Sequence, residues 1–131
     1  MANFKNLLSI QQRLEEKSEQ IEAIKQRRRT LFADVPANEK EIISLHFEIE
    51  LKKLELLHIK REQITELKSS TDVYDKTMYL HQLTRLQSIN EKCITLLVKR
   101  LFEEGHGLEL KKRGLVRECT YVNPMILHQK V

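Results

Sequence analysis

The residues of this chain that could carry chemistry are few, and their spacing matches no common site. His46 and Glu50 lie four residues apart in a stretch with helical periodicity, so they would share one face of a helix, where such a pair can begin a metal site. A di-metal centre in a helical protein needs Glu-x-x-His pairs and further carboxylates on neighbouring helices, and the sequence has no second element of that kind. His58 would lie about 120° round the helix from His46. The sequence therefore predicts histidines in packing or surface positions and no metal site.

The two cysteines are equally poor candidates for catalysis. Cys93 falls in an apolar stripe, where a cysteine usually behaves as a small hydrophobic residue, and no histidine stands at a spacing that would activate it. Together with the distant Cys119 it makes no zinc half-site and no disulfide framework, which fits a reducing compartment. Gly105, Gly107 and Gly114 lack the spacing of a phosphate-binding loop. We therefore expect no enzyme activity, no catalytic residue and no cofactor.

The composition favours a single helical domain. The chain has 131 residues, of which 40% are hydrophobic and 32% charged, with three Gly, two Pro and no Trp. Many helix formers and few turn formers argue against a β-sandwich or a barrel. The sequence shows neither a secretory signal at its start nor the roughly 20 consecutive apolar residues of a membrane span. We expect an intracellular all-α protein without a membrane span, in the cytoplasm or the nucleus.

The stretch from Glu41 to Leu67 is the element around which the other helices would be arranged. It contains no Gly or Pro and carries apolar residues on two sides. One stripe at helical spacing is Ile43, Phe47, Leu51, Leu54, Leu57, Ile64 and Leu67, and a second is Ile42, Leu45, Ile49, Leu56 and Ile59. A helix that is apolar over much of its circumference must be covered on several sides. We therefore expect this stretch to be the central helix of a bundle.

A heptad seam predicts a helix before the central one. Apolar residues recur from Leu7 to Leu31 at alternating gaps of three and four, interrupted by Lys17 and Arg28. The two charged residues could extend past an open edge or select a register and a partner. The seam could pack against the chain's own helices or meet another polypeptide, and the pattern does not decide between the two.

The break between these two helices is the clearer of two predicted breaks. Pro36 forbids continuation of the first helix, and Asn38 followed by Glu41 has the form of a capping box that opens the central helix. The connection is short, which favours an antiparallel hairpin.

The second break, at residues 69–72, is weaker because it contains Ser, Ser, Thr and Asp but no Gly or Pro. The helix could run through as one rod of about 100 Å or turn to give a three-helix bundle, and we favour the turn. The prediction is a bundle over 1–104 with coiled-coil character, made of helices at about 3–32, 38–68 and 72–104.

The predicted third helix and the tail carry more apolar residues than self-contained elements need. The segment from Ile94 to Phe102 is more apolar than a surface helix requires, which indicates an additional covered face. Asn90 would either fix the register of the seam or point outward. The tail over 105–131 is basic and apolar and clusters β-forming residues, so we expect a short irregular or β-prone segment. It could dock to a partner or fold back on the bundle.

These features predict a non-enzymatic coiled-coil subunit or adaptor within a larger intracellular complex. It would assemble with other helical subunits, or with itself, by burying exposed apolar stripes and a C-terminal docking segment. The residues predicted to bind the partner are Leu7, Ile10, Leu14, Ile21, Ile24, Leu96, Leu97, Leu101, Phe102, Tyr121, Met125, Ile126 and Leu127.

The alternative is a small basic nucleic-acid-binding protein associated with chromatin or RNA. The net charge is +4, and the excess is concentrated in two clusters that could contact phosphates or direct localisation. The clusters are Lys25, Arg27, Arg28 and Arg29 near the end of the first helix, and Lys111, Lys112 and Arg113 in the tail. Positive charge at a helix C-terminus already has a structural explanation, and aromatic residues suited to base stacking are few. We therefore rank this function second.

Overall fold

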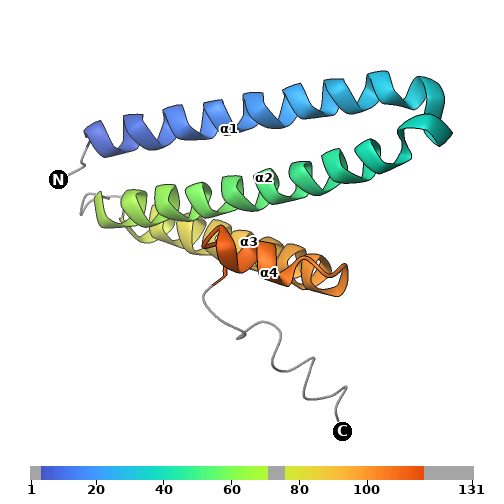
Figure 1. Ribbon diagram of the computed structural model, residues 1–131. Helices are drawn as coiled ribbons and strands as arrows, with labels where there is room; N and C mark the ends of the chain where they lie inside the picture. Colours follow the sequence, from blue (N-terminus) through green and yellow to red (C-terminus); the bar gives the residue numbers. More distant parts are fainter. Residues whose placement is uncertain (1–3, 71–75, 117–131) are drawn as a thin grey trace, which may run out of the picture.

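The computed structural model describes residues 4–70 and 76–116, which form three long helices and one short one (Figure 1). The elements are α1 (Phe4–Leu31), a 3-10 turn η1 (Phe32–Asp34), α2 (Val35–Ser70), α3 (Lys76–Glu103) and α4 (Gly107–Lys112). These ranges contain no strand, so the all-α class predicted from the sequence is confirmed for the described part of the chain.

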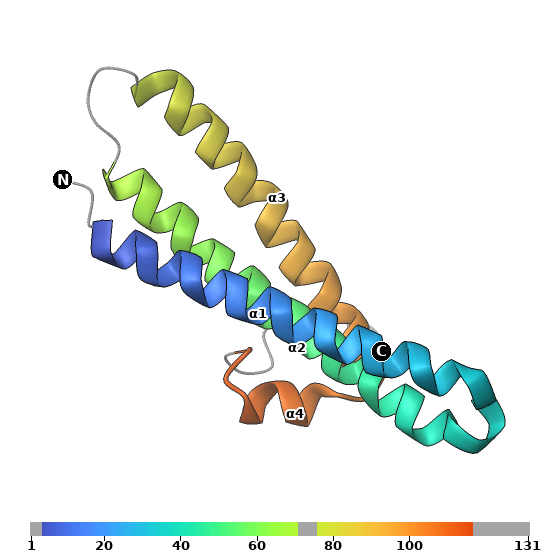
Figure 2. The same cartoon turned by 90° about the horizontal axis from the view of Figure 1, so that it is seen from above.

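Helix α2 lies between α1 and α3, and both neighbours run antiparallel to it (Figures 1 and 2). Ion pairs mark the register of α1: Arg13 with Glu62 at 2.7 Å, Lys17 with Glu55 at 2.8 Å and Arg27 with Glu41 at 2.7 Å. The residue numbers of the partners on α2 decrease as those on α1 increase, so the two helices run in opposite directions. The same reasoning applies to α3, where Gln87, Glu91 and Arg100 contact Lys68, Arg61 and Glu50 of α2.

The turn between α1 and α2 is built differently from the prediction. Helix α2 begins at Val35, one residue before Pro36, because the first turn of a helix does not need the N–H group that proline lacks. The side chain of Asp34 accepts a hydrogen bond from the backbone N–H of Ala37 at 3.3 Å. Asp34 therefore satisfies one of the unpaired N–H groups of the first turn, as an N-terminal capping residue does.

Asn38 and Glu41 do not form the predicted capping box. Both lie inside α2, where Asn38 Nδ2 donates to the backbone carbonyl of Leu31 at 3.0 Å and Glu41 pairs with Arg27. The two side chains reach across the turn to α1 rather than back to their own helix. They hold the two arms of the turn together.

The main core lies between α2, α3 and the segment that follows α3. Its buried residues are Leu51, Leu54, Ile94, Leu97, Val98, Leu101, Leu110, Leu115 and Val116. Asn90 is also buried, and its Nδ2 donates to the backbone carbonyl of Leu57 on α2 at 3.0 Å. Because this buried amide finds its hydrogen-bond partner at a single position, it favours one alignment of α3 on α2.

The start of the tail is helical, which corrects the β-prone prediction for that part. Gly105 has φ 90, a conformation that glycine adopts without strain, and it reverses the chain after α3. The chain then forms α4, whose Leu110 is fully buried, and continues into buried Leu115 and Val116. Leu, Glu and Lys are good helix formers, so the composition of α4 agrees with its helix, and Leu110 packs on core residues of α2 and α3. The rest of the tail, 117–131, lies outside the described residues.

Candidate functional site

The seam predicted on α1 faces α2. Ile10 and Ile21 are buried, and Leu7, Leu14 and Ile24 are half-buried. The two charged residues that interrupt the seam have partners on α2: Lys17 pairs with Glu55, and Arg28 Nη1 lies 3.2 Å from His46 Nδ1. The structure thus shows the alternative in which the seam packs within the chain. A partner could reach the buried Ile10 and Ile21 only if α1 separated from α2.

The four partner-binding residues predicted near the end of α3 divide into two groups. Leu97 and Leu101 belong to the core, and Phe102 is half-buried against it beside Gly107. Only Leu96 points outward, with 67% of its surface exposed. The residues predicted in the tail, Tyr121, Met125, Ile126 and Leu127, lie outside the described residues.

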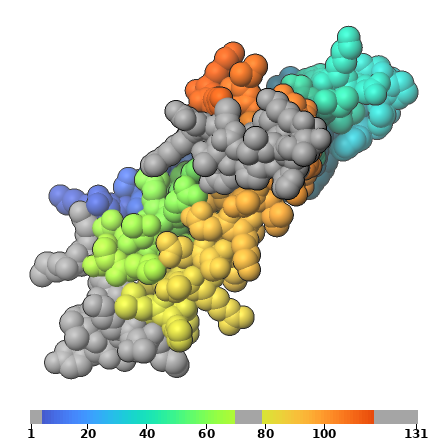
Figure 3. All heavy atoms as spheres, turned by 90° about the horizontal axis from the view of Figure 1, so that it is seen from below, coloured from blue at the N-terminus to red at the C-terminus, as the bar shows by residue number. Residues whose placement is uncertain are grey.

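Leu96 is one end of an apolar row, and the predicted site did not include the other members of that row. Leu86 and Ile89 are 53% and 51% exposed, and Cys93 is an exposed free cysteine. We call Leu86, Ile89, Cys93 and Leu96 the outer stripe. The gaps are three, four and three residues, which is the heptad spacing of a coiled-coil seam. Helix α3 thus has a buried face toward α2 and a second apolar face toward solvent; it forms much of the near side in Figure 3, where it is yellow to orange.

A groove between α3 and α2 continues the outer stripe. It has a volume of about 410 Å³ and takes its apolar lining from Leu56, Leu57, Cys93, Leu96 and Leu97. One end is closed by polar groups. The carboxylate of Glu50, whose side chain is almost completely buried, accepts a hydrogen bond from Arg100 and lies 3.8 Å from Lys53 Nζ. Since this buried charge is compensated, the end of the groove is a structural link between α2 and α3.

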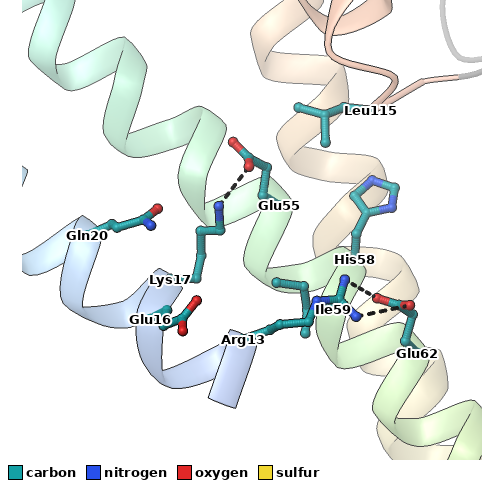
Figure 4. Close-up of a pocket in the computed structure, with 9 residues that line it drawn as sticks. All are labelled: Arg13, Glu16, Lys17, Gln20, Glu55, His58, Ile59, Glu62 and Leu115. Atoms are coloured by element: carbon teal, nitrogen blue, oxygen red, sulfur yellow. Dashed lines mark hydrogen bonds and ion pairs between the residues drawn. The ribbon is translucent and has the colours of Figure 1, made fainter. Parts of the chain in front are cut away.

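A second cavity, of about 310 Å³, lies where α1, α2 and Leu115 meet (Figure 4). Its cations are paired with its carboxylates, because Arg13 binds Glu62 and Lys17 binds Glu55. His58 projects from α2 into this region and has a lowered pKa, first because of burial and second because of nearby Arg61; the backbone of Leu115 acts in the opposite direction. No nucleophile stands beside it among the lining residues. The arrangement holds α1 and the segment after α4 on α2.

Arg61 forms a bidentate polar link between α2 and α3. Its guanidinium donates to both carboxylate oxygens of Glu91, at 2.6 and 2.7 Å. This hydrogen bonding lowers the pKa of Glu91. The bidentate geometry is the one that best matches guanidinium to carboxylate.

Two of the four arginines in the predicted basic clusters bind acidic groups of the chain itself. Arg27 pairs with Glu41, and Arg113 contacts Glu109 at 2.9 Å and Glu48 at 2.8 Å. The hydrogen bond to Glu109 is the main reason that the pKa of Arg113 is raised. The remaining members differ in exposure: Lys25 and Arg28 are half-buried, and Arg29, Lys111 and Lys112 are exposed. Two of the cations offered for phosphate binding are therefore already neutralised locally.

No group of three or more His, Cys, Asp or Glu side chains in residues 4–70 and 76–116 is placed to hold a metal ion. Of the helices described, none combines the length and apolar character that crossing a bilayer requires.

Comparison with known proteins matches this chain to no protein-family model, no curated protein and no solved structure. The outer stripe is the most distinctive feature of the chain's described surface.

Proposed function

We propose that this protein is a non-enzymatic subunit or adaptor that joins a larger assembly by burying the outer stripe of α3 against a partner helix. In this proposal the three long helices form an antiparallel bundle with coiled-coil character, and α2 covers the inward apolar faces of α1 and α3. The stripe on α3 is the apolar surface left over. The tail from 117 onward is proposed as a second contact.

The continuity of the outer stripe is the observation that supports this function. Single exposed apolar side chains are normal on protein surfaces, whereas a row at heptad spacing is what a partner helix requires. Fully burying a Leu or Ile side chain is worth roughly 1.5–3 kcal/mol relative to leaving it exposed. The stripe's side chains are already about half covered, so a stable complex also needs the apolar lining of the groove.

Photo-crosslinking in the cells that express the protein tests this proposal. A photoreactive amino acid at Ile89 would lie in the middle of the outer stripe, and the same amino acid at Glu19 on the exposed side of α1 would be the matched control. We expect an adduct with an identifiable protein from position 89 but not from position 19. The adduct should disappear when Leu86→Asp and Leu96→Asp are introduced. Identical adducts from both positions, or none from position 89, would contradict the proposal.

The nucleic-acid alternative is separated from this function by ionic strength. Binding through phosphates weakens steeply as salt rises, whereas burial of an apolar stripe does not. A titration of the chain with a duplex and with a single-stranded oligonucleotide at two salt concentrations would therefore show which kind of contact dominates.

A further inference from the structure

We infer that the occupant of the outer stripe and its groove is a single amphipathic helix whose apolar row is flanked by Glu or Asp side chains. This inference rests on the proposed function and names the chemistry of the partner. It depends on cations that border the stripe on both sides, of which those on α3 have no ion pair within the described chain.

One border is formed by α3 itself. Arg85, Lys92 and Lys99 follow one another at intervals of seven residues and are all exposed. A seven-residue interval returns to nearly the same side of a helix, so the three cations form a row. Each lies next to the outer stripe on the side away from the core, in the position that the g residues hold in a coiled coil. None of the three has an ion pair with a residue in the described ranges.

The opposite border is formed by α2. Lys53 lines the groove, and Lys60, seven residues further along, lies on the same side of α2 and is exposed. Acidic groups are scarce on this face. Glu50 is buried and bound to Arg100, and Glu91, which lines a hollow with Lys92 and Leu96, is bound to Arg61. Glu103 and Glu104 lie at the end of α3, beyond the stripe. An apolar row between two rows of cations is complementary to a helix with an acidic flank on each side of its apolar residues.

The shape of the surface also suits a helix. The outer stripe begins at Leu86 and ends at Leu96, so it is about 15 Å long at 1.5 Å per residue. Side chains at gaps of three and four form the ridges and holes into which the residues of a second helix fit. A partner strand would instead need unpaired backbone groups at a sheet edge, and the described chain has no strand.

A second copy of this chain does not have the required chemistry. Antiparallel pairing of two α3 helices would place Arg85, Lys92 and Lys99 of one copy beside the same cations of the other. The exposed side of α1 does carry acidic residues, but Leu8 is its only exposed large apolar residue among those described, so it lacks an apolar row.

The chain's own tail is also a poor match. Residues 117–131 contain the apolar residues Met125, Ile126 and Leu127, but only one acidic residue against two basic ones. A segment of that charge gains nothing from a groove bordered by lysines and arginines. The observations therefore favour a different polypeptide as the occupant.

Two synthetic peptides test the inference directly. Each has three heptads with Leu at positions a and d; one has Glu at e and g, and the other has Lys at the same positions. The full-length chain is titrated with each labelled peptide by fluorescence anisotropy at low salt, below the concentration at which the peptides self-associate. We expect the Glu peptide to bind about tenfold more tightly, because several exposed charge pairs of up to about 1 kcal/mol each distinguish the two.

Two variants of the protein define the contacts. Leu96→Asp should weaken binding of the Glu peptide by at least about tenfold, since it places a charge where the outer stripe meets the apolar lining of the groove. The double variant Lys92→Glu with Lys99→Glu should reverse the preference between the peptides. All three positions are exposed, so neither variant should change the circular dichroism spectrum or the midpoint of thermal unfolding.

Three results would overturn the inference. These are equal binding of the two peptides, binding that ignores Leu96→Asp, and a single-stranded RNA that binds through the border cations more tightly than the Glu peptide. If photo-crosslinking at Ile89 still identifies a stripe-dependent partner, the proposed function would stand while the acidic-helix inference would fail. Loss of that crosslink would remove the proposed function itself.

Discussion

Leu110→Ala should destabilise the protein strongly, although it changes one residue of a six-residue helix near the end of the described chain. Leu110 is 0% exposed and belongs to the main core with residues from α2 and α3. Leu108, two positions earlier on the same helix, is 77% exposed. The pair therefore forms a matched comparison in which the chemical change is identical and only burial differs.

The magnitude follows from burial. Removing a fully buried leucine side chain in favour of alanine typically costs about 3–5 kcal/mol, and the cost is smaller where the surroundings can close the cavity. Helix α4 is short and can shift toward the vacated space, so we expect about 3 kcal/mol for Leu110→Ala. For Leu108→Ala we expect less than about 0.5 kcal/mol, because an exposed site loses almost no packing and the two residues have similar helix propensities.

Urea unfolding followed by circular dichroism measures both variants. We expect the midpoint for Leu110→Ala to fall clearly below that of the wild type, and its thermal midpoint to drop by about 10 °C. The reasoning would be refuted if the two substitutions had equal effects, or if Leu110→Ala cost less than about 1 kcal/mol. Either result would mean that α4 does not pack on the core in solution.

Two further predictions concern polar groups inside the fold. The pKa of His58 is lowered in the fold, so the unfolded state binds more protons; its contribution to stability is therefore complete above the ordinary value of 6.5 and is lost as the pH falls below it. Urea unfolding at about pH 7.5 and pH 5.5 should show this loss in the wild type and a smaller one in His58→Gln, and equal losses would contradict the assignment. Asn90→Ala removes the hydrogen bond to the carbonyl of Leu57 and should lower the free energy of unfolding by about 1 kcal/mol. Substitution of exposed Ser88 by Ala is the control, and an Asn90→Ala protein as stable as that control would show that the buried bond contributes nothing.

The helical class was predictable because it depends on composition and on long periodic stretches. The sequence also predicted that other elements cover α2 on several sides, since its apolar residues follow more than one stripe. In the structure Ile49, Leu51 and Leu54 are almost completely buried. Each of these features is a property of a single helix, so it can be predicted without knowing how the helices are arranged.

The predictions that were wrong concern details that depend on contacts between different parts of the chain. Asn38 and Asp34 are equally good capping residues by type, and only the path of the turn decides which one meets a free N–H group. Leu108 and Leu110 alternate as strand residues do, but Leu, Glu and Lys also favour a helix, and the contact of Leu110 with the core agrees with the helix. Periodicity alone cannot tell which of two faces points inward.

Helix α3 shows this last point most clearly. Leu97 and Leu96 are adjacent leucines in one apolar run, and the sequence treats them alike as partner-binding residues. Adjacent residues point about 100° apart on a helix, and here the core takes Leu97 and Val98 while Leu96 faces solvent. The outer stripe could have been found by asking whether a second row at heptad spacing remains once the first is assigned to the core.

Hydroxyl-radical footprinting tests the central claim most directly, because it reports side-chain exposure in the isolated chain and in the cell. We predict that Leu86, Ile89 and Leu96 are labelled readily in the isolated protein and are protected in the cell, while Leu108, which is exposed and lies away from the stripe, is labelled equally in both. Labelling of the outer stripe that is unchanged between the two, or protection that is already complete in the isolated chain, would contradict the account.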